Sequence, residues 1–196
     1  MPMILYRTLI AAAAAVAIVL GGVMLNYATA QGGRPDVHFV PTPQQVVDRM
    51  LELAKIQPGD FLIDLGSGDG RIPITAAKRY GIKAMGIDID PDRIKEANEN
   101  AKKEGVTDKV SFKQANLFEE DISKANVITL YLLERLNAKL RLKLLSDLKP
   151  GSRVVSHAFS MGDWKPDTHE LVDGRSVYLW TIPAKKAGAP VDRRGS

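Results

Sequence analysis

The sequence predicts an α/β domain: a doubly wound, mostly parallel sheet of seven strands with an antiparallel hairpin at its C-terminal end. Three observations support this prediction. Short apolar runs alternate with segments of helical periodicity over most of the chain. The alternation ends in two strand-like runs joined by Asp173-Gly174, which is a typical hairpin turn. The chain has 196 residues, of which 45% are hydrophobic, so it can form one domain with a sizeable core.

Five strands are expected before the hairpin, and each is a short run of apolar or β-branched residues. The expected strands begin with residues 61–63 and continue with 83–88, 110–113, 127–131 and 153–157. The hairpin then pairs residues 171–172 with 177–180. The run at 127–131 (VITLY) is nearly all apolar or β-branched, which is typical of a parallel strand buried on both faces. Together these runs give the seven strands.

Helix start and stop signals separate the strands. Thr42-Pro43-Gln44-Gln45 has the pattern of a capping box, followed by apolar residues at helical spacing up to Ala54. Further helices are expected at residues 71–80, 91–104 and 136–148. Pro73 is tolerable because it falls in a first turn, and Gly105 is a stop signal. The predicted helices therefore lie between the predicted strands, on both faces of the sheet.

The segment Asp64-Leu65-Gly66-Ser67-Gly68-Asp69-Gly70, between the first strand and a helix, indicates the kind of ligand. Glycines at alternate positions let backbone N–H groups and a helix N-terminus approach a ligand closely. A dinucleotide fingerprint would need another glycine where Arg71 stands. Two carboxylates in one loop, Asp64 and Asp69, also disfavour a pyrophosphate. The pattern therefore favours a cationic ligand.

S-adenosylmethionine fits these residues, because it carries a sulfonium and an α-ammonium and no phosphate. The strand at residues 83–88 ends in Asp88, at about the distance downstream where a carboxylate accepts hydrogen bonds from ribose hydroxyls. The glycine segment alone could equally be an ordinary strand-to-helix turn. The acidic end of the next strand favours the ligand-binding interpretation.

The N-terminal residues 1–30 are expected to lie outside the domain. Thr8–Leu25 is an apolar run without charge, preceded by Arg7, and Asn26–Ala30 has the small-x-small ending of a signal peptidase site. A cleaved secretory signal, an uncleaved membrane anchor and a buried helix all remain open. The first two interpretations predict that the segment engages the membrane or the secretion machinery. The domain would then be exported, or anchored on the far side of the membrane.

Composition and the remaining segments limit the kinds of partner, nucleophile and metal site that the chain can have. Residues 31–37 form a polar linker, and 184–196 a basic tail expected to be disordered. The net charge of +4 allows an acidic partner or a membrane surface without requiring one. The absence of cysteine excludes thiol nucleophiles and thiolate zinc sites, and 3 scattered histidines predict no metal site. Basic residues within 136–148 have no interleaved aromatics, so we expect a solvated face and no nucleic-acid partner.

The motifs resemble a known family over residues 41–183. DLGSGDG, GIDID and VITLY resemble the class I, seven-strand S-adenosylmethionine-dependent methyltransferases, which have a Rossmann-like fold. FVPTPQQVV, DLGSGDGRI, TLYLL and VVSHAF are similar, more narrowly, to the broad-specificity protein lysine methyltransferases of archaea and their bacterial relatives. Eukaryotic relatives of that group modify lysines on mitochondrial membrane proteins. The resemblance implies a methyltransferase domain at 38–183 and a protein substrate that presents lysine, with membrane or envelope proteins as candidate substrates.

The resemblance also implies roles for single residues. Asp64 and Gly66 would face the methionine end of the donor, Asp88 the ribose, and Asn116 the adenine edge, where the family usually has aspartate. The whole expected donor-binding set is Phe39, Thr42, Asp64, Gly66, Ser67, Gly68, Gly70, Asp88, Ile89, Asn116 and Leu117. The chain departs from the family at three acceptor-side positions: Phe39 replaces a tyrosine, and Ala158 and Ser160 replace aspartates.

Methyl transfer is an in-line displacement, so the protein mainly supplies alignment, a dry pocket and an uncharged nucleophile. Tyr131, at the end of a strand, is the candidate catalytic residue that lines the acceptor channel, although a core tyrosine is an equal alternative. His157 is a candidate base or, more simply, a structural histidine. A small-molecule methyltransferase and a non-enzymatic binding domain are the alternative functions, the latter because an exported domain would lack donor.

Overall fold

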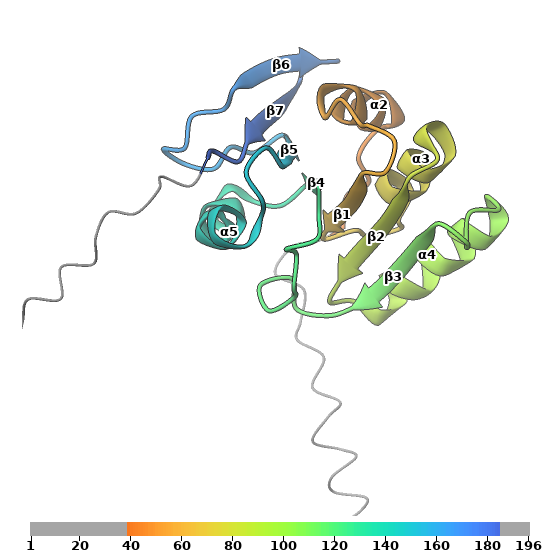
Figure 1. Cartoon of the computed structure of the whole chain (residues 1–196). Helices are drawn as coiled ribbons and strands as arrows, with labels where there is room; N and C mark the ends of the chain where they lie inside the picture. The colour runs from red at the N-terminus through yellow and green to blue at the C-terminus, as the bar shows by residue number, and fades with distance from the viewer. Residues whose placement is uncertain (1–38, 185–196) are drawn as a thin grey trace, which may run out of the picture. The chain divides into compact units, whose positions relative to one another are not determined.

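The computed structural model describes residues 39–184 of the chain (Figure 1). The expected leader at 1–30, the linker at 31–37 and all but the first residue of the tail at 184–196 lie outside the described residues. Within 39–184, no helix combines the length and the apolar character that a membrane span requires. The apolar run Thr8–Leu25 lies outside these residues.

The predicted fold class is confirmed: one seven-stranded sheet has the strand order β3-β2-β1-β4-β5-β7-β6. The five strands β1 to β5 are mutually parallel, whereas β7 is antiparallel to β5 and β6 is antiparallel to β7. The strands are β1 (Phe61–Leu65), β2 (Lys83–Asp88), β3 (Val110–Gln114), β4 (Val127–Leu130), β5 (Arg153–His157), β6 (Thr168–Val172) and β7 (Arg175–Thr181).

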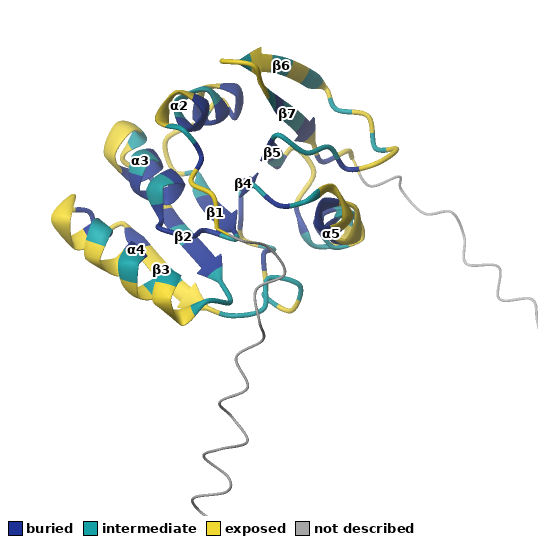
Figure 2. Cartoon of the chain, turned by 180° about the vertical axis from the view of Figure 1, so that it is seen from behind, coloured by how far each residue is buried: buried dark blue, intermediate teal, exposed yellow. Residues whose placement is uncertain are grey.

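Helices cover both faces of this sheet, as Figure 1 shows. The helices are α2 (Gln44–Leu53), α3 (Arg71–Tyr80), α4 (Pro91–Lys103) and α5 (Glu134–Asp147). Residues of α2, α3 and α4 belong to one buried cluster, and α5 belongs to the other, together with the buried ring of Trp180. Figure 2 shows the buried side of each helix turned towards the strands. The sheet is therefore the middle layer of three.

Most predicted boundaries agree with the structure to within two residues. The hairpin turn has Asp173 at φ 50° and Gly174 at φ 73°, the left-handed values that a two-residue turn of this kind needs. Two differences matter for the site. Asp64 lies inside β1 and not in the loop after it, and β4 ends at Leu130, one residue before Tyr131.

The predicted capping box at Thr42 is wrong. Pro43 occupies the N-cap position of α2, and no side chain caps the helix. The Thr42 hydroxyl lies instead 3.2 Å from Nδ1 of His157, a residue 115 positions along the chain. The pattern Thr-x-x-Gln fits a cap locally, but a buried partner brought close by the fold takes the hydroxyl.

The strand order reverses direction at β1, because the chain winds outwards from β1 to β3 and then returns to β4 on the other side. The helix after β1 and the helix after β4 cover opposite faces. In open α/β sheets, a crevice forms at the carboxyl ends of the strands at such a switch point. The glycine segment follows β1, so it lies at this crevice.

Candidate functional site

A cavity of about 590 Å³ lies at the carboxyl ends of the parallel strands. That volume is in the range of small-molecule sites. Ten of the predicted site residues line it: Phe39, Thr42, Asp64, Gly66, Ser67, Asp88, Ile89, Asn116, Leu117 and Tyr131. The other two predicted residues, Gly68 and Gly70, are described by the structure but do not line this cavity. The fold thus brings ten of the predicted residues, between positions 39 and 131, to one cavity.

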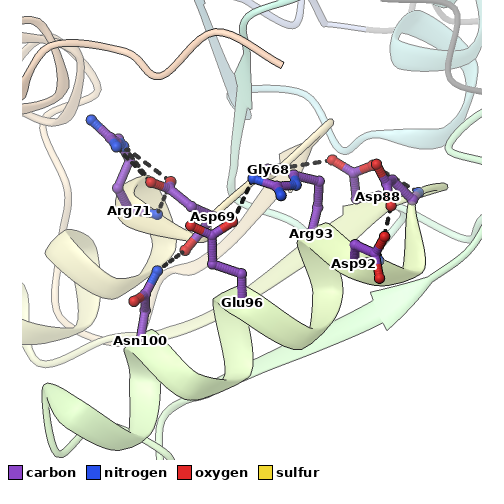
Figure 3. A network of polar contacts seen from close by, with 9 residues as sticks. Gly68, Asp69, Arg71, Asp88, Asp92, Arg93, Glu96 and Asn100 are labelled. Carbon is purple, nitrogen blue, oxygen red and sulfur yellow. Dashed lines mark hydrogen bonds and ion pairs between the residues drawn. The ribbon is translucent and has the colours of Figure 1, made fainter. Parts of the chain in front are cut away.

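The bend after β1 is fixed by hydrogen bonds to the end of β2. The N–H groups of Gly66 and Ser67 both donate to the carbonyl of Ile87, at 2.8 and 3.0 Å. The Gly68 N–H donates to Oδ2 of Asp88 at 2.8 Å, as Figure 3 shows. Gly66 has φ 83° and Gly68 φ 52°, values that favour glycine. The same carboxylate that was predicted to bind ribose therefore also holds the bend.

The glycines of the bend are also required for packing. A Cβ on Gly68 would lie 2.2 Å from Cε2 of Phe39, and a Cβ on Gly70 would lie 2.4 Å from Cζ of Phe112. Neither distance is compatible with a side chain. A side chain at position 68 would therefore displace Phe39, a residue that lines the cavity. The sequence explains Gly68 by close approach of the ligand, whereas in the structure the Phe39 ring occupies the space where its Cβ would lie.

Asp69 is paired with Arg71, a contact that sequence reasoning missed. The Arg71 guanidinium donates to both carboxylate oxygens of Asp69, with Nε at 3.0 and 3.1 Å (Figure 3). Its Nη1 also donates to the carbonyl of Thr42 at 2.9 Å. Asp69 and Arg71 both line the cavity. The negative charge of Asp69 is thus largely compensated, so Asp64, Asp88 and Asp90, which also lines the cavity, carry the acidic character of the site.

Asp64 is buried, with 2% of its surface exposed, and Thr129 donates a hydrogen bond to its Oδ1 at 2.7 Å. Burial raises the pKa of Asp64 to about 7, the hydrogen bond from Thr129 opposes the rise, and the charges of Asp88 and Asp69 add to it. A carboxyl in this state gains its full charge only when a cation is near or the pH is high. The preference for a cationic ligand is therefore coupled to proton release.

Asp88 and Asn116 differ in how far their polar atoms are already used. Oδ1 of Asp88 accepts from the Asp90 N–H at 3.0 Å, and each oxygen of this half-buried carboxylate can accept further bonds. The Asn116 amide donates to Glu119 at 2.7 Å, and its oxygen accepts from the Phe118 N–H at 3.1 Å. Asn116 thus closes the turn after β3. Its predicted contact with adenine stays a prediction and would have to share these atoms.

Ser67 offers a polar atom without a partner. Its Oγ is buried and has no hydrogen-bond partner among the described residues, and Ser67 lines the cavity. This oxygen lies only 2.6 Å from where a Cβ on Gly86 would stand, so it faces β2 and not the cavity. The open bend and the carboxylates of Asp64 and Asp88 together fit a ligand with ammonium and ribose groups.

Aromatic rings form the part of the wall that follows β4 and β5. The Tyr131 ring lies 3.9 Å from the His157 ring and 6.3 Å from the Phe159 ring, measured between centroids. Tyr131 and Phe159 line the cavity. His157 is only 1% exposed, and burial, followed by the charge of Arg175, lowers its pKa to about 4. His157 is therefore neutral at pH 7 and supports Tyr131, which favours the structural role over that of a base.

A short strap of residues 39–42 connects the bend to this aromatic part of the wall. Phe39 contacts Gly68 on one side, and the Arg93 guanidinium lies 5.0 Å from its ring centroid on the other. Thr42 joins Arg71 through its carbonyl and His157 through its hydroxyl. Arg93 was missed by sequence reasoning, because only its tertiary contact with Phe39 identifies it. Arg71 and Phe159 stand inside the motifs DLGSGDGRI and VVSHAF, but the sequence assigned neither of them a role in the site.

The described residues hold no group of three or more histidine, cysteine, aspartate or glutamate side chains that could bind a metal ion.

Comparison with known proteins identifies relatives of the whole domain. A family model described as the ANTKMT methyltransferase domain matches residues 64–168, more than half of the chain. A protein-lysine N-methyltransferase of Saccharolobus islandicus is 48% identical over 157 residues, covering 78% of this chain and 98% of that protein. The adenine nucleotide translocase lysine N-methyltransferase of Mus musculus is 31% identical over 163 residues, and the match covers 83% of this chain and 69% of that protein.

Solved structures agree on the fold and the ligand. A Salinibacter ruber protein described as an RNA methyltransferase, in complex with S-adenosyl-L-homocysteine, is 55% identical with a TM-score of 0.73. The match covers 78% of this chain and 99% of that one. An S-adenosylmethionine-dependent methyltransferase of Geobacter sulfurreducens, also with S-adenosyl-L-homocysteine, is 27% identical with a TM-score of 0.54 and covers 63% of this chain and 51% of that one.

We predict that Asp88→Ala weakens donor binding by about 1 to 3 kcal/mol, because it removes a charge-assisted acceptor. The variant also frees the Gly68 N–H, so loss of the bend contributes to the effect. Calorimetric titration with S-adenosylmethionine measures the change. Asp88→Asn, which keeps one acceptor oxygen, should lose less. Unchanged affinity in Asp88→Ala would contradict the prediction that Asp88 binds the ribose of the donor.

We predict that Gly68→Val greatly reduces donor binding, because its side chain collides with Phe39 and strains a backbone with φ 52°. The double variant Gly68→Val with Phe39→Ala separates these causes in the same titration. Recovery of part of the affinity would identify the displaced ring as the cause. Wild-type affinity in the single variant would mean that the bend is only a turn.

We predict that affinity for the donor rises, by up to about twentyfold, between about pH 5.5 and pH 7.5, since a cation binds the ionised form of Asp64. The sign follows from the raised pKa: below about 7 the folded protein holds the proton, and binding must displace it. Titrations in two buffers of different ionisation enthalpy measure the released proton. Asp64→Asn should bind more weakly and show no such slope; an equal slope in that variant would contradict the assignment.

Proposed function

The chain belongs to the ANTKMT family of S-adenosylmethionine-dependent protein-lysine methyltransferases, and we propose that it methylates lysine side chains on the surface of partner proteins. The observation that carries this proposal is the 48% identity to a protein-lysine N-methyltransferase over 98% of that relative's length. The small-molecule and non-enzymatic alternatives are not favoured, because the relatives from Saccharolobus islandicus and Mus musculus, at 48% and 31% identity, carry names of lysine methyltransferases.

The proposed division of labour follows the two walls of the cavity. S-adenosylmethionine supplies a methyl group made electrophilic by the adjacent sulfonium. On one wall Asp64 would accept from the ammonium group, Asp88 from the ribose and the main chain at Gly66 would allow close approach. Ile89 and Leu117 would flank the base with apolar surface. On the other wall Tyr131 and Phe159 would flank the acceptor side chain.

A lysine acceptor must lose its proton before it can act as a nucleophile. The wall formed by Tyr131 and Phe159 is aromatic, and the aspartates that line the cavity come from other segments. A lysine ammonium that leaves water for such a wall has a lowered pKa, since burial disfavours the charged form. The neutral His157 behind Tyr131 adds no positive charge to repel it. Alignment and desolvation would therefore be the main contributions of this chain.

An RNA acceptor is the competing candidate, because the Salinibacter ruber relative is described as an RNA methyltransferase. Single-stranded RNA binding depends on unpaired basic side chains interleaved with aromatic rings. On α5, Arg141 is paired with Asp163 and Lys143 with Asp147, whereas Lys139 lies 4.1 Å from the Phe118 ring centroid and lines the cavity. The α5 surface thus does not separate the two acceptors, and the proposal of a protein acceptor rests on the identity to the lysine methyltransferases.

We further propose that the natural substrates lie at a membrane or in the envelope and that the chain is exported or membrane-anchored. The support is the uncharged apolar run Thr8–Leu25 with its following small-residue motif. A cleaved leader would leave the domain from about residue 31, whereas an anchor would keep it at the bilayer. The mass of the native protein and its cell fraction test this proposal. A full-length chain in the cytoplasmic fraction would contradict it.

The acceptor class is tested by transfer of radiolabelled methyl from S-adenosylmethionine to separated soluble and membrane fractions of the source cells. We expect label in protein, removed by protease but not by ribonuclease, and recovered as methyl-lysine after acid hydrolysis. The membrane fraction should incorporate more label than the soluble one. Asp88→Ala is the matched control for donor-dependent transfer. Label removed by ribonuclease would assign an RNA acceptor instead.

A further inference from the structure

The turn after β5 carries Phe159 and has a conformation that its sequence does not favour. Ala158 has φ 64°, in the left-handed region that a residue with a Cβ seldom adopts. The Phe159 N–H donates to the carbonyl of His157 at 2.8 Å and closes a three-residue turn. The Ala158 N–H donates to the backbone carbonyl of Ser176 on β7 at 2.7 Å. A strained backbone of this kind persists only where neighbouring groups hold it.

Asn137 on α5 supplies the groups that hold this turn. Its side-chain nitrogen lies 3.1 Å from Oγ of Ser156, 3.1 Å from the carbonyl of Phe159 and 3.2 Å from that of Ser160. Two N–H hydrogens are thus shared among three oxygens. The Ser156 hydroxyl also donates to the Phe159 carbonyl, at 2.7 Å. The Phe159 carbonyl therefore accepts from both a helix and a strand.

An asparagine is an unexpected residue at this place in the core. Asn137 is 0% exposed and lies on the buried side of α5, where Leu136, Leu140 and Leu144 are all apolar. Its Oδ1 is buried and has no hydrogen-bond partner among the described residues. An unpaired buried carbonyl is unfavourable, and an aliphatic side chain would avoid that cost. The need for the two N–H donors is what accounts for the amide.

We propose that Asn137 is a positioning residue, which fixes Phe159 and through it Tyr131 on the acceptor side of the cavity. Asn137 is not among the described residues that line the cavity, whereas Phe159 and Tyr131 both line it. Their rings are stacked, with an interplanar angle of 24°. The lysine acceptor rests on the proposed function. The contacts from the Asn137 amide to Phe159, and from Phe159 to Tyr131, do not depend on it. The turn thus sets the width of the acceptor side.

The kinetic test uses Asn137→Ala and Asn137→Asp, with poly-L-lysine as the acceptor probe. Both variants lose the donors, so we expect KM for poly-L-lysine to rise by about five- to tenfold while the dissociation constant for S-adenosylmethionine stays unchanged. Leu140→Ala is the matched control: it removes a fully buried side chain of the same helix and should lower stability without changing that KM. An equal loss in Leu140→Ala, or a parallel loss of donor affinity, would reduce Asn137 to a packing residue.

A double-variant cycle asks whether Asn137 acts through Phe159. If it does, Asn137→Ala should add nothing to the KM of Phe159→Ala, because residues that act on one structural unit are not additive. Full additivity of the two effects would overturn the proposal.

A third measurement needs no acceptor. The chain has 5 phenylalanines, so the protein can be labelled with 4-fluorophenylalanine and the Phe159 resonance assigned by its absence in Phe159→Leu. We expect Asn137→Ala to shift or broaden that fluorine resonance and Leu140→Ala to leave it in place. If the wild-type protein failed to methylate poly-L-lysine or any protein extract, the proposed function would fail and this resonance would still decide the role of Asn137. An unmoved resonance in Asn137→Ala would contradict that role.

Discussion

The site depends on three hydrogen bonds at the bend after β1. The Gly68 N–H donates to the Asp88 carboxylate, and the N–H groups of Gly66 and Ser67 share the Ile87 carbonyl. These bonds tie the bend after β1 to the end of β2, at the point where the sheet changes direction. Because the bend is held from outside, its backbone can keep the left-handed values that leave space over the cavity. Phe39 then packs against Gly68, and Thr42 at the end of the same strap contacts His157 behind Tyr131.

Electrostatics in the cavity are more finely balanced than two neighbouring carboxylates suggest. Arg71 compensates Asp69, and burial keeps Asp64 close to its titration point at neutral pH. The ion pair and the burial of Asp64 thus reduce the repulsion among the carboxylates of a site that suits a cation. On the other wall a neutral histidine supports Tyr131. Both walls thus suit a positively charged donor and an amine that must become neutral.

Local pattern in the sequence was enough to predict much of the fold and of the site. The strands, the helices after the bend and the hairpin at Asp173-Gly174 follow from periodicity and turn residues, and ten predicted site residues meet at one cavity because parallel strands end at one edge. The features that were missed depend on partners far along the chain. Thr42 fits a helix cap until His157 is placed beside it, and Asn137 is an ordinary helix residue until the turn at Phe159 is known. Neither contact leaves a local signal.

Above all, we infer that the pinned, acidic bend selects a cationic sulfur nucleoside over an anionic nucleotide. A single set of calorimetric titrations of the wild-type protein tests this most directly, with S-adenosylmethionine, NAD and ATP compared at the same pH and ionic strength. We expect saturable binding of S-adenosylmethionine and no measurable binding of NAD or ATP. Tight binding of NAD or ATP, with no response to S-adenosylmethionine, would contradict it.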